Sequence, residues 1–163
     1  MQKFEDLEKI APGISMLSEE DHIAIQRFTI LWSLFEAKFL GYWGSSQIIS
    51  ANVTKLDDSI FDKLWFEDEL TYFKNRYYVE NKFTDHFPNL NLRKSDNLEL
   101  VQSVLSSINN TPKEQLVACL TIVYRFRNNL FHGTKWAYGI QDQQANFNNS
   151  VSLLKKCIQQ FDI

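Results

Sequence analysis

The segment RFRNNLFHG holds the side chains in this sequence best suited to chemistry, because an arginine, an asparagine and a histidine occur within six positions. An α-helix turns by ~100° per residue, so Arg127 falls in the middle of an apolar stripe with Leu120, Val123 and Leu130. A guanidinium in apolar surroundings is costly unless an anion pairs with it. The sequence therefore predicts an anion at Arg127, which is either a carboxylate of the chain or a ligand.

Glu36 is the carboxylate of the chain best suited to that pairing. By helical spacing it lies between Trp32, Leu40 and Trp43, on the flank of an apolar stripe rather than on the polar side of its helix. A Glu36 to Arg127 ion pair is the structural interpretation of the pattern, and it would leave the arginine without a chemical role. The functional interpretation is that Arg127 binds an anion from outside the chain.

His132 lies near the predicted end of the same helix. Asn128 and His132 are four residues apart and share a face, whereas His132 and Arg127 are separated by ~140°. Gly133 allows the helix to end, so that the imidazole can turn toward Arg127. The alternative is a histidine that only interacts with the negative end of the helix dipole.

The sequence predicts no metal site and no cofactor. His22 and His86 lack matching polar neighbours, and no group of His, Cys, Asp or Glu has convincing metal-ligand spacing. Cys119 and Cys157 fall at apolar helical positions, so we expect two reduced core residues.

The elements that must position these residues are helical almost throughout. Five Gly and three Pro leave few breaks in the apolar periodicity, which predicts an all-α, antiparallel up-and-down bundle of four to five helices. We expect one domain over 1–163, with its core at about 19–161. Four of the expected helices start at Ser18, at Asp57 or Asp58, at Ser95 and at Thr111, and a last helix carries Phe147 to Phe161. A long connection over 81–94 is expected between the second and third helices.

Thr111 marks the clearest helix start. It supplies an N-cap, Pro112 stands at the first helical position, and Glu114 follows three residues after the cap. This helix is predicted to run to His132 and so carries the whole motif. Ser18, followed by three acidic residues, is predicted to cap the first helix, which ends near Gly41 to Gly44.

Length, composition and charge limit the class of protein. A chain of 163 residues with 44% hydrophobic and 14% aromatic residues can bury a real core, which excludes global disorder. It has no ~18-residue apolar run and no apolar signal core at its start, so we expect a soluble, cytoplasmic protein. The net charge of −3 does not suit duplex binding, but residues 111–163 carry +3 and residues 1–110 carry −6. An anion site is therefore expected in the C-terminal third, unless this asymmetry is chance.

The Arg127 to His132 segment resembles the signature of the HEPN superfamily, in which an Arg, usually an Asn, a short spacer and a His are set in a small helical bundle. The resemblance of the bundle covers about 19–161. It implies a homodimer and a metal-independent endoribonuclease that cuts single-stranded RNA with two facing motifs. It also implies the alternative of a non-catalytic module that binds a nucleotide or a partner protein. Such families occur in toxin-antitoxin and other defence systems.

The resemblance also implies roles for individual residues. Arg127 would bind the phosphate, Asn128 would donate a hydrogen bond to it, and His132 from each chain would carry protons. An antitoxin or a nucleotidyltransferase would be a possible partner, although Thr134 stands where the tyrosine modified by such partners is found. Glu36 and Asn129 are expected to support the site, Lys135, Trp136 and Tyr138 to contact RNA, and Phe126 and Phe131 to pack in the core.

Overall fold

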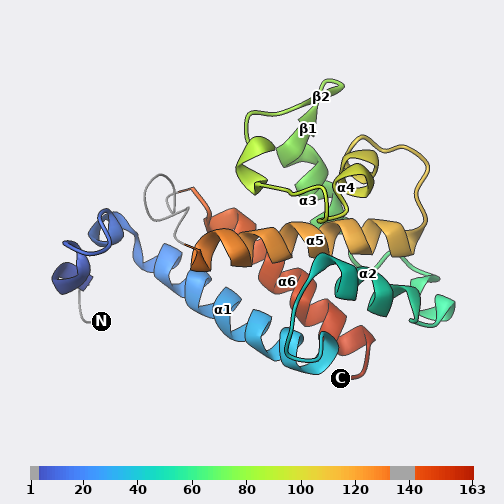
Figure 1. Cartoon of the computed structure of the whole chain (residues 1–163), viewed down its shortest axis with the longest axis horizontal. Helices are drawn as coiled ribbons and strands as arrows, with labels where there is room; N and C mark the ends of the chain where they lie inside the picture. Colours follow the sequence, from blue (N-terminus) through green and yellow to red (C-terminus); the bar gives the residue numbers. More distant parts are fainter. Residues whose placement is uncertain (1–3, 133–141) are drawn as a thin grey trace.

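The computed structural model describes residues 4–132 and 142–163, which form six α-helices, short 3₁₀ turns and one two-stranded hairpin (Figure 1). The predicted all-α bundle is confirmed. In these described ranges, no helix is both long and apolar enough to cross a membrane. The helices are α1 (Glu19–Phe39), α2 (Ser46–Thr54), α3 (Glu67–Tyr77), α4 (Leu98–Leu105), α5 (Pro112–Phe131) and α6 (Gln144–Gln160).

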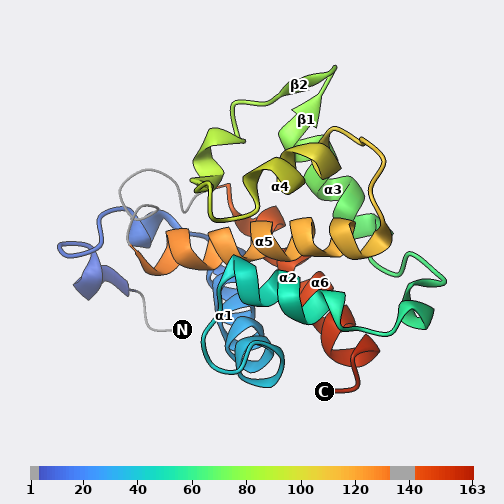
Figure 2. The same cartoon turned by 45° about the vertical axis from the view of Figure 1, so that its right-hand side comes forward.

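Helix α5 is the central element of the bundle. Thirteen of its 20 residues are buried, because other elements cover it on several sides. In Figures 1 and 2, α1 and α2 lie on one side of α5, while α3, α4 and the hairpin lie on the other, and α6 crosses behind it. Helix α5 packs against α2, α3 and α4, and α1 packs mainly against α6.

Both predicted capping residues begin their helices. The Ser18 hydroxyl accepts the Asp21 N–H at 3.1 Å, and the Asp21 carboxylate accepts the Ser18 N–H at 3.0 Å. Thr111 and Glu114 form the same reciprocal pair at 3.2 and 2.7 Å. Each pair satisfies donors that a helix N-terminus leaves without partners.

The core is aromatic where α1 meets α6. Phe28 and Phe147 are fully or almost fully buried, and their ring centroids are 5.0 Å apart. Cys119 and Cys157 are buried and not bonded to each other, as predicted. Burial raises the pKa of both thiols well above the usual value, so neither is activated as a nucleophile.

The helix predicted to start at Asp57 or Asp58 begins only at Glu67, so this start was wrong. The residues before it form the 3₁₀ turn Asp58–Phe61, and the indole N–H of Trp65 donates to a backbone carbonyl of that turn at 3.1 Å. The apolar residues in this segment therefore have helical spacing in the sequence although they lie in a turn. The acidic residues of the first turn of α3 mark where the helix begins.

Helix α2 was not predicted. Ser45 caps it, because its hydroxyl accepts the Ile48 N–H at 3.2 Å. Ile49 and Val53 are fully buried on its inner face. At nine residues, α2 is too short to give a clear apolar period in the sequence.

A hairpin occupies the start of the predicted connection over 81–94. Strand β1 (Tyr78–Val79) pairs antiparallel with β2 (Lys82–Phe83). Glu80 and Asn81 form the turn with φ values of 52° and 62°, the left-handed conformation of a type I′ turn. Helix α3 therefore ends at Tyr77, directly before β1.

The predicted cap of α4 was also wrong. Asn97, not Ser95, occupies the N-cap position, while the Ser95 carbonyl accepts the Ser46 hydroxyl at 2.8 Å. Helix α4 ends at Leu105, so Ile108 lies beyond it and is exposed.

We expect Thr111→Ala to lower the free energy of unfolding by about 1 kcal/mol, because the substitution removes the side-chain half of the α5 capping box. Urea unfolding followed by circular dichroism measures this change. Thr71→Ala, at an exposed position inside α3, is the matched control and should change stability by less than about 0.5 kcal/mol. Equal losses for the two variants would show that the cap contributes nothing to stability.

Candidate functional site

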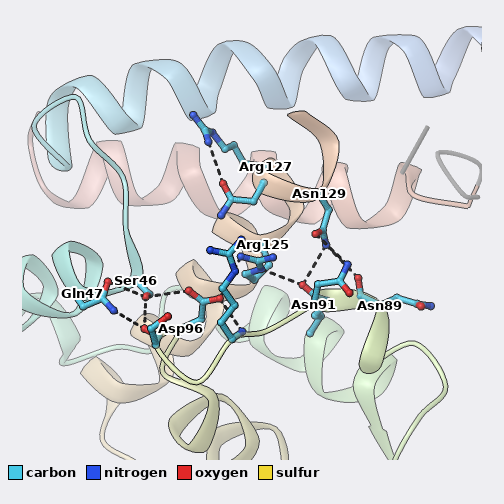
Figure 3. Close-up of polar contacts among 12 residues, drawn as sticks. Ser46, Gln47, Asn89, Asn91, Asp96, Arg125, Arg127 and Asn129 are labelled. Carbon is cyan, nitrogen blue, oxygen red and sulfur yellow. Dashed lines mark hydrogen bonds and ion pairs between the residues drawn. The ribbon is translucent and has the colours of Figure 1, made fainter. Parts of the chain in front are cut away.

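Arg127 lies on α5 with its guanidinium directed toward α1 (Figure 3). The residue is half-buried, in agreement with the prediction that it points toward apolar surroundings. Its Nη1 donates to the Oδ1 of Asn128 at 3.0 Å, and its Cζ lies 5.4 Å from the ring centroid of Phe131. Both contacts are with neutral groups, so neither balances the positive charge.

The Glu36 to Arg127 ion pair is absent. Within the described residues, no carboxylate oxygen lies within 4.0 Å of the Arg127 guanidinium. The Glu36 carboxylate instead accepts the backbone N–H of Gly44 at 3.0 Å. A Cβ at Gly44 would lie 2.7 Å from that carboxylate oxygen, so the missing side chain is what allows this close approach. Glu36 therefore closes the turn after α1, and among the residues that the structure describes no other carboxylate takes its place at Arg127.

The Nε of Arg127 is buried and has no hydrogen-bond partner in the described part of the chain. Most buried polar atoms are hydrogen-bonded, so an unsatisfied one needs a physical explanation. Within the described ranges, the guanidinium thus lacks both a counterion and an acceptor for Nε. An anion bound at the Nη side of this group would balance its charge.

Asn128 and His132 follow the arginine on α5. Asn128 is buried, and its backbone carbonyl accepts the N–H of His132 at 2.9 Å, so the helical path continues to the histidine. The side chain of His132 is exposed at the end of α5. Phe131, predicted to be in the core, is 55% exposed, whereas Phe126 is buried as predicted. Phe131 lies in the last turn of α5, on a side left open, whereas Asn129 and Leu130 in the same turn are buried.

Arg125 is the deeply buried arginine of α5, and the sequence analysis did not identify it. Its side chain is directed to the opposite side of the helix from Arg127 (Figure 3). Its Nη1 lies 3.2 Å from the Asp96 carboxylate, and its Nε donates to the Leu90 carbonyl at 3.1 Å. Arg125 and Asp96 are only 4% and 5% exposed. Burial lowers the pKa of Arg125, and the charge of Asp96 opposes that effect.

Asn129 shares the face of Arg125 rather than that of Arg127. Its Nδ2 donates to the backbone carbonyls of Asn89 and Leu90, each at 3.2 Å, and its Oδ1 accepts from Asn91 at 3.3 Å (Figure 3). These contacts hold the 3₁₀ turn Pro88–Leu90 against α5. The structure therefore does not bring Asn129 to the arginine it was predicted to support.

Asp96 joins three elements through one carboxylate. Besides Arg125, it accepts the backbone N–H of Arg93 at 2.9 Å, and its Oδ1 lies 3.4 Å from the hydroxyl of Ser46, which donates at 2.8 Å to the carbonyl of the adjacent Ser95. Ser46 begins α2, and Asp96 precedes α4. This network fixes the second half of α5, on which Arg127 and His132 are carried.

Lys135, Trp136 and Tyr138, the predicted RNA contacts, lie outside the described residues. Among the residues that are described, no three His, Cys, Asp or Glu side chains form a group that could hold a metal ion. The candidate site is therefore limited to Arg127, Asn128 and Phe131 in the last turns of α5 and His132 at its C-cap.

The chain matches no family model, no curated protein and no solved structure. The features of the chain that indicate a function are therefore the geometry of α5 and the resemblance of its motif.

The two arginines of α5 should differ sharply in their effect on stability. Arg125→Met leaves the buried Asp96 carboxylate without its partner and should lower the free energy of unfolding by about 3 to 5 kcal/mol. Arg127→Met removes no ion pair and should change it by no more than about 1 kcal/mol. Urea unfolding of the two variants measures the difference.

The double variant Arg125→Met, Asp96→Asn is the control, because it removes both charges, keeps an acceptor for the Arg93 N–H and should recover much of the stability lost in Arg125→Met. Similar losses for Arg125→Met and Arg127→Met would contradict the assignment of Arg125 as structural and Arg127 as available to a ligand.

Proposed function

We propose that this chain is a metal-independent endoribonuclease of HEPN type, which cleaves single-stranded RNA at a site formed by two copies. One observation carries the proposal: the guanidinium of Arg127 has no carboxylate partner in the described residues and lies near the end of the helix that exposes His132. Arg125, two residues earlier on the same helix, is in contrast paired with Asp96.

Arg127 would bind the phosphodiester. The planar guanidinium fits two oxygens of a phosphate, and no carboxylate of the described residues balances its positive charge. Asn128 would hold the guanidinium in place, because its Oδ1 accepts from Nη1. Its amide nitrogen would then donate to the phosphate oxygens as negative charge develops on them during the reaction.

The reaction requires two proton transfers. The 2′-oxygen of the RNA attacks the adjacent phosphorus and gives its proton to a base, while the bond from phosphorus to the 5′-oxygen breaks and that oxygen receives a proton from an acid. The products are a 2′,3′-cyclic phosphate and a 5′-hydroxyl. Histidine suits both roles, because its imidazole changes protonation near neutral pH.

Each chain offers one His132, which is why the proposal needs two copies. Two motifs facing each other across a two-fold axis would supply one imidazole as the base and the other as the acid. The exposed ring of Phe131 lies next to Arg127 and would stack on a base of the bound strand, a contact that single-stranded nucleic acids favour.

The purified protein should cleave single-stranded RNA in excess EDTA and leave 2′,3′-cyclic phosphate and 5′-hydroxyl ends. His132→Ala should lower the cleavage rate by at least ~10² to 10⁴, because the substitution removes both proton carriers. Gel assays with end-group analysis measure both results.

His86→Ala is the matched control, since His86 is also exposed but lies outside α5. This variant should cleave at the wild-type rate, and both variants should keep the wild-type circular dichroism spectrum. Cleavage that survives His132→Ala, or that EDTA abolishes, would overturn the proposed mechanism. Binding of RNA without any cleavage would instead identify a non-catalytic module.

A further inference from the structure

A groove lies between α1 and α6, with a volume of about 480 Å³. Small-molecule sites have volumes of ~300–1,000 Å³, but most of them are lined by apolar and aromatic side chains. This groove has one apolar side chain in its lining, so its composition favours a charged ligand that accepts hydrogen bonds. The polar residues of the lining are Arg27 of α1 and Asn148, Ser152, Lys155, Lys156 and Gln159 of α6.

The packing of α1 on α6 explains why Arg27 reaches this groove. Phe28 contacts Phe147, and Phe39 contacts Phe161, with ring centroids 5.0 and 4.6 Å apart. The two helices therefore run side by side in the same direction. Arg27 precedes the buried Phe28 and points ~100° away from it, toward the edge of α1 that borders the exposed side of α6.

Three cations meet in the groove, and their charges are only partly balanced. The Nζ of Lys156 lies 2.9 Å from the Glu69 carboxylate and 4.0 Å from that of Asp68. Across residues 4–132 and 142–163, no carboxylate oxygen lies within 4.0 Å of Arg27 or Lys155, and both residues are exposed. Helix α6 itself contains no Asp or Glu. The groove therefore keeps a net positive charge.

Glu69 of α3 fixes two of the groove side chains from behind. It is 2% exposed and accepts the Ser152 hydroxyl at 2.5 Å and the Lys156 amine at 2.9 Å. A lysine amine carries three protons, so Lys156 can still donate into the groove while it is bound to Glu69. A donor that is already held in place loses less conformational freedom when a ligand binds. Lys156 is therefore better prepared for binding than a freely moving surface lysine.

The arrangement of donors suits linked phosphates. An arginine guanidinium binds two oxygens of one phosphate, and a lysine amine binds phosphate as a point charge. Arg27 approaches from α1, whereas Lys155 and Lys156 approach from α6, so the cations flank the groove on two sides. A ligand with two linked phosphates can contact both sides at once. The amides of Asn148 and Gln159 add neutral donors to the same lining.

The groove is separate from the site at Arg127. Trp32 marks the side of α1 that faces α5, because its ring centroid lies 6.1 Å from that of Tyr124. Arg27 is five residues before Trp32, so the two positions are ~140° apart around α1. A ligand in the groove would therefore lie on a different side of α1 from a phosphate bound at Arg127.

We propose that the groove between α1 and α6 binds a small anion with two or more linked phosphates, which Arg27, Lys155 and Lys156 hold. This second anion site does not rest on the proposed ribonuclease activity. The bound anion would join α1 to α6 and so stabilise the folded chain.

Isothermal titration calorimetry with inorganic pyrophosphate tests the site. The wild-type chain should bind with a dissociation constant below ~1 mM, and Arg27→Gln and Lys155→Gln should each weaken binding by ~10-fold, because each removes a charged donor. Neither residue has an ion pair in the described ranges, so both variants should fold. Lys63→Gln makes the same charge change at an exposed position outside the groove and should bind as the wild type does. No binding by the wild type, or equal losses in the three variants, would overturn the proposal.

Two further titrations distinguish this site from the one at Arg127 and define its ligand. Arg127→Met should keep the wild-type affinity for pyrophosphate, whereas binding that is lost in this variant and kept in Lys155→Gln would place the anion on α5 and overturn the proposal. Sulfate should bind at least ~10-fold more weakly than pyrophosphate, and equal affinity would contradict the requirement for linked phosphates.

Adenosine diphosphate distinguishes the two sources of a diphosphate group. Affinity equal to that of pyrophosphate would support a site that recognises the phosphates alone, and tighter binding would support one that also contacts the organic group. Loss of binding when the nucleoside is attached would overturn the groove as a site for organic diphosphates. Cleavage of RNA by Lys155→Gln at the wild-type rate would separate this site from the proposed activity.

Discussion

The buried ion pair between Arg125 and Asp96 is the interaction on which the arrangement of this molecule depends. It joins the second half of α5 to the residues before α4, and through Ser46 it also reaches α2. A buried charge pair is stabilising only when its remaining donors and acceptors are satisfied, and here Leu90 and Arg93 complete the set. The second half of α5, which carries Arg127, is therefore anchored to the elements around it.

The neighbouring arginine, Arg127, differs from Arg125 in its polar contacts. Arg127 lies two residues further along the same helix but has no counterion in the described residues, and its Nε lacks an acceptor. One helix thus carries an arginine that completes the fold and another whose guanidinium has no carboxylate within 4.0 Å among the described residues. This difference is the physical basis for proposing that an external phosphate binds at Arg127. The HEPN resemblance adds the type of reaction proposed for that phosphate.

The sequence could predict local features well and relations between helices poorly. The capping boxes at Ser18 and Thr111 were predictable because their partners are three residues apart. The partner of Glu36 was not predictable from the sequence. A tight turn brings the backbone N–H of Gly44 to the carboxylate, where the guanidinium of Arg127 was expected. Arg125 was missed for a different reason. Periodicity assumes one buried face, whereas α5 is covered on several sides, so residues ~200° apart can both point inward.

The central claim is that Arg127, and not Arg125, binds an external phosphate. Nuclear magnetic resonance of the arginine Nε–H groups tests it directly, during a titration with a short single-stranded RNA whose 2′-hydroxyls are methylated to prevent cleavage. The account predicts that the Arg127 resonance, assigned from its loss in Arg127→Met, shifts on titration while that of Arg125 stays in place. RNA binding that leaves the Arg127 resonance unmoved would contradict it.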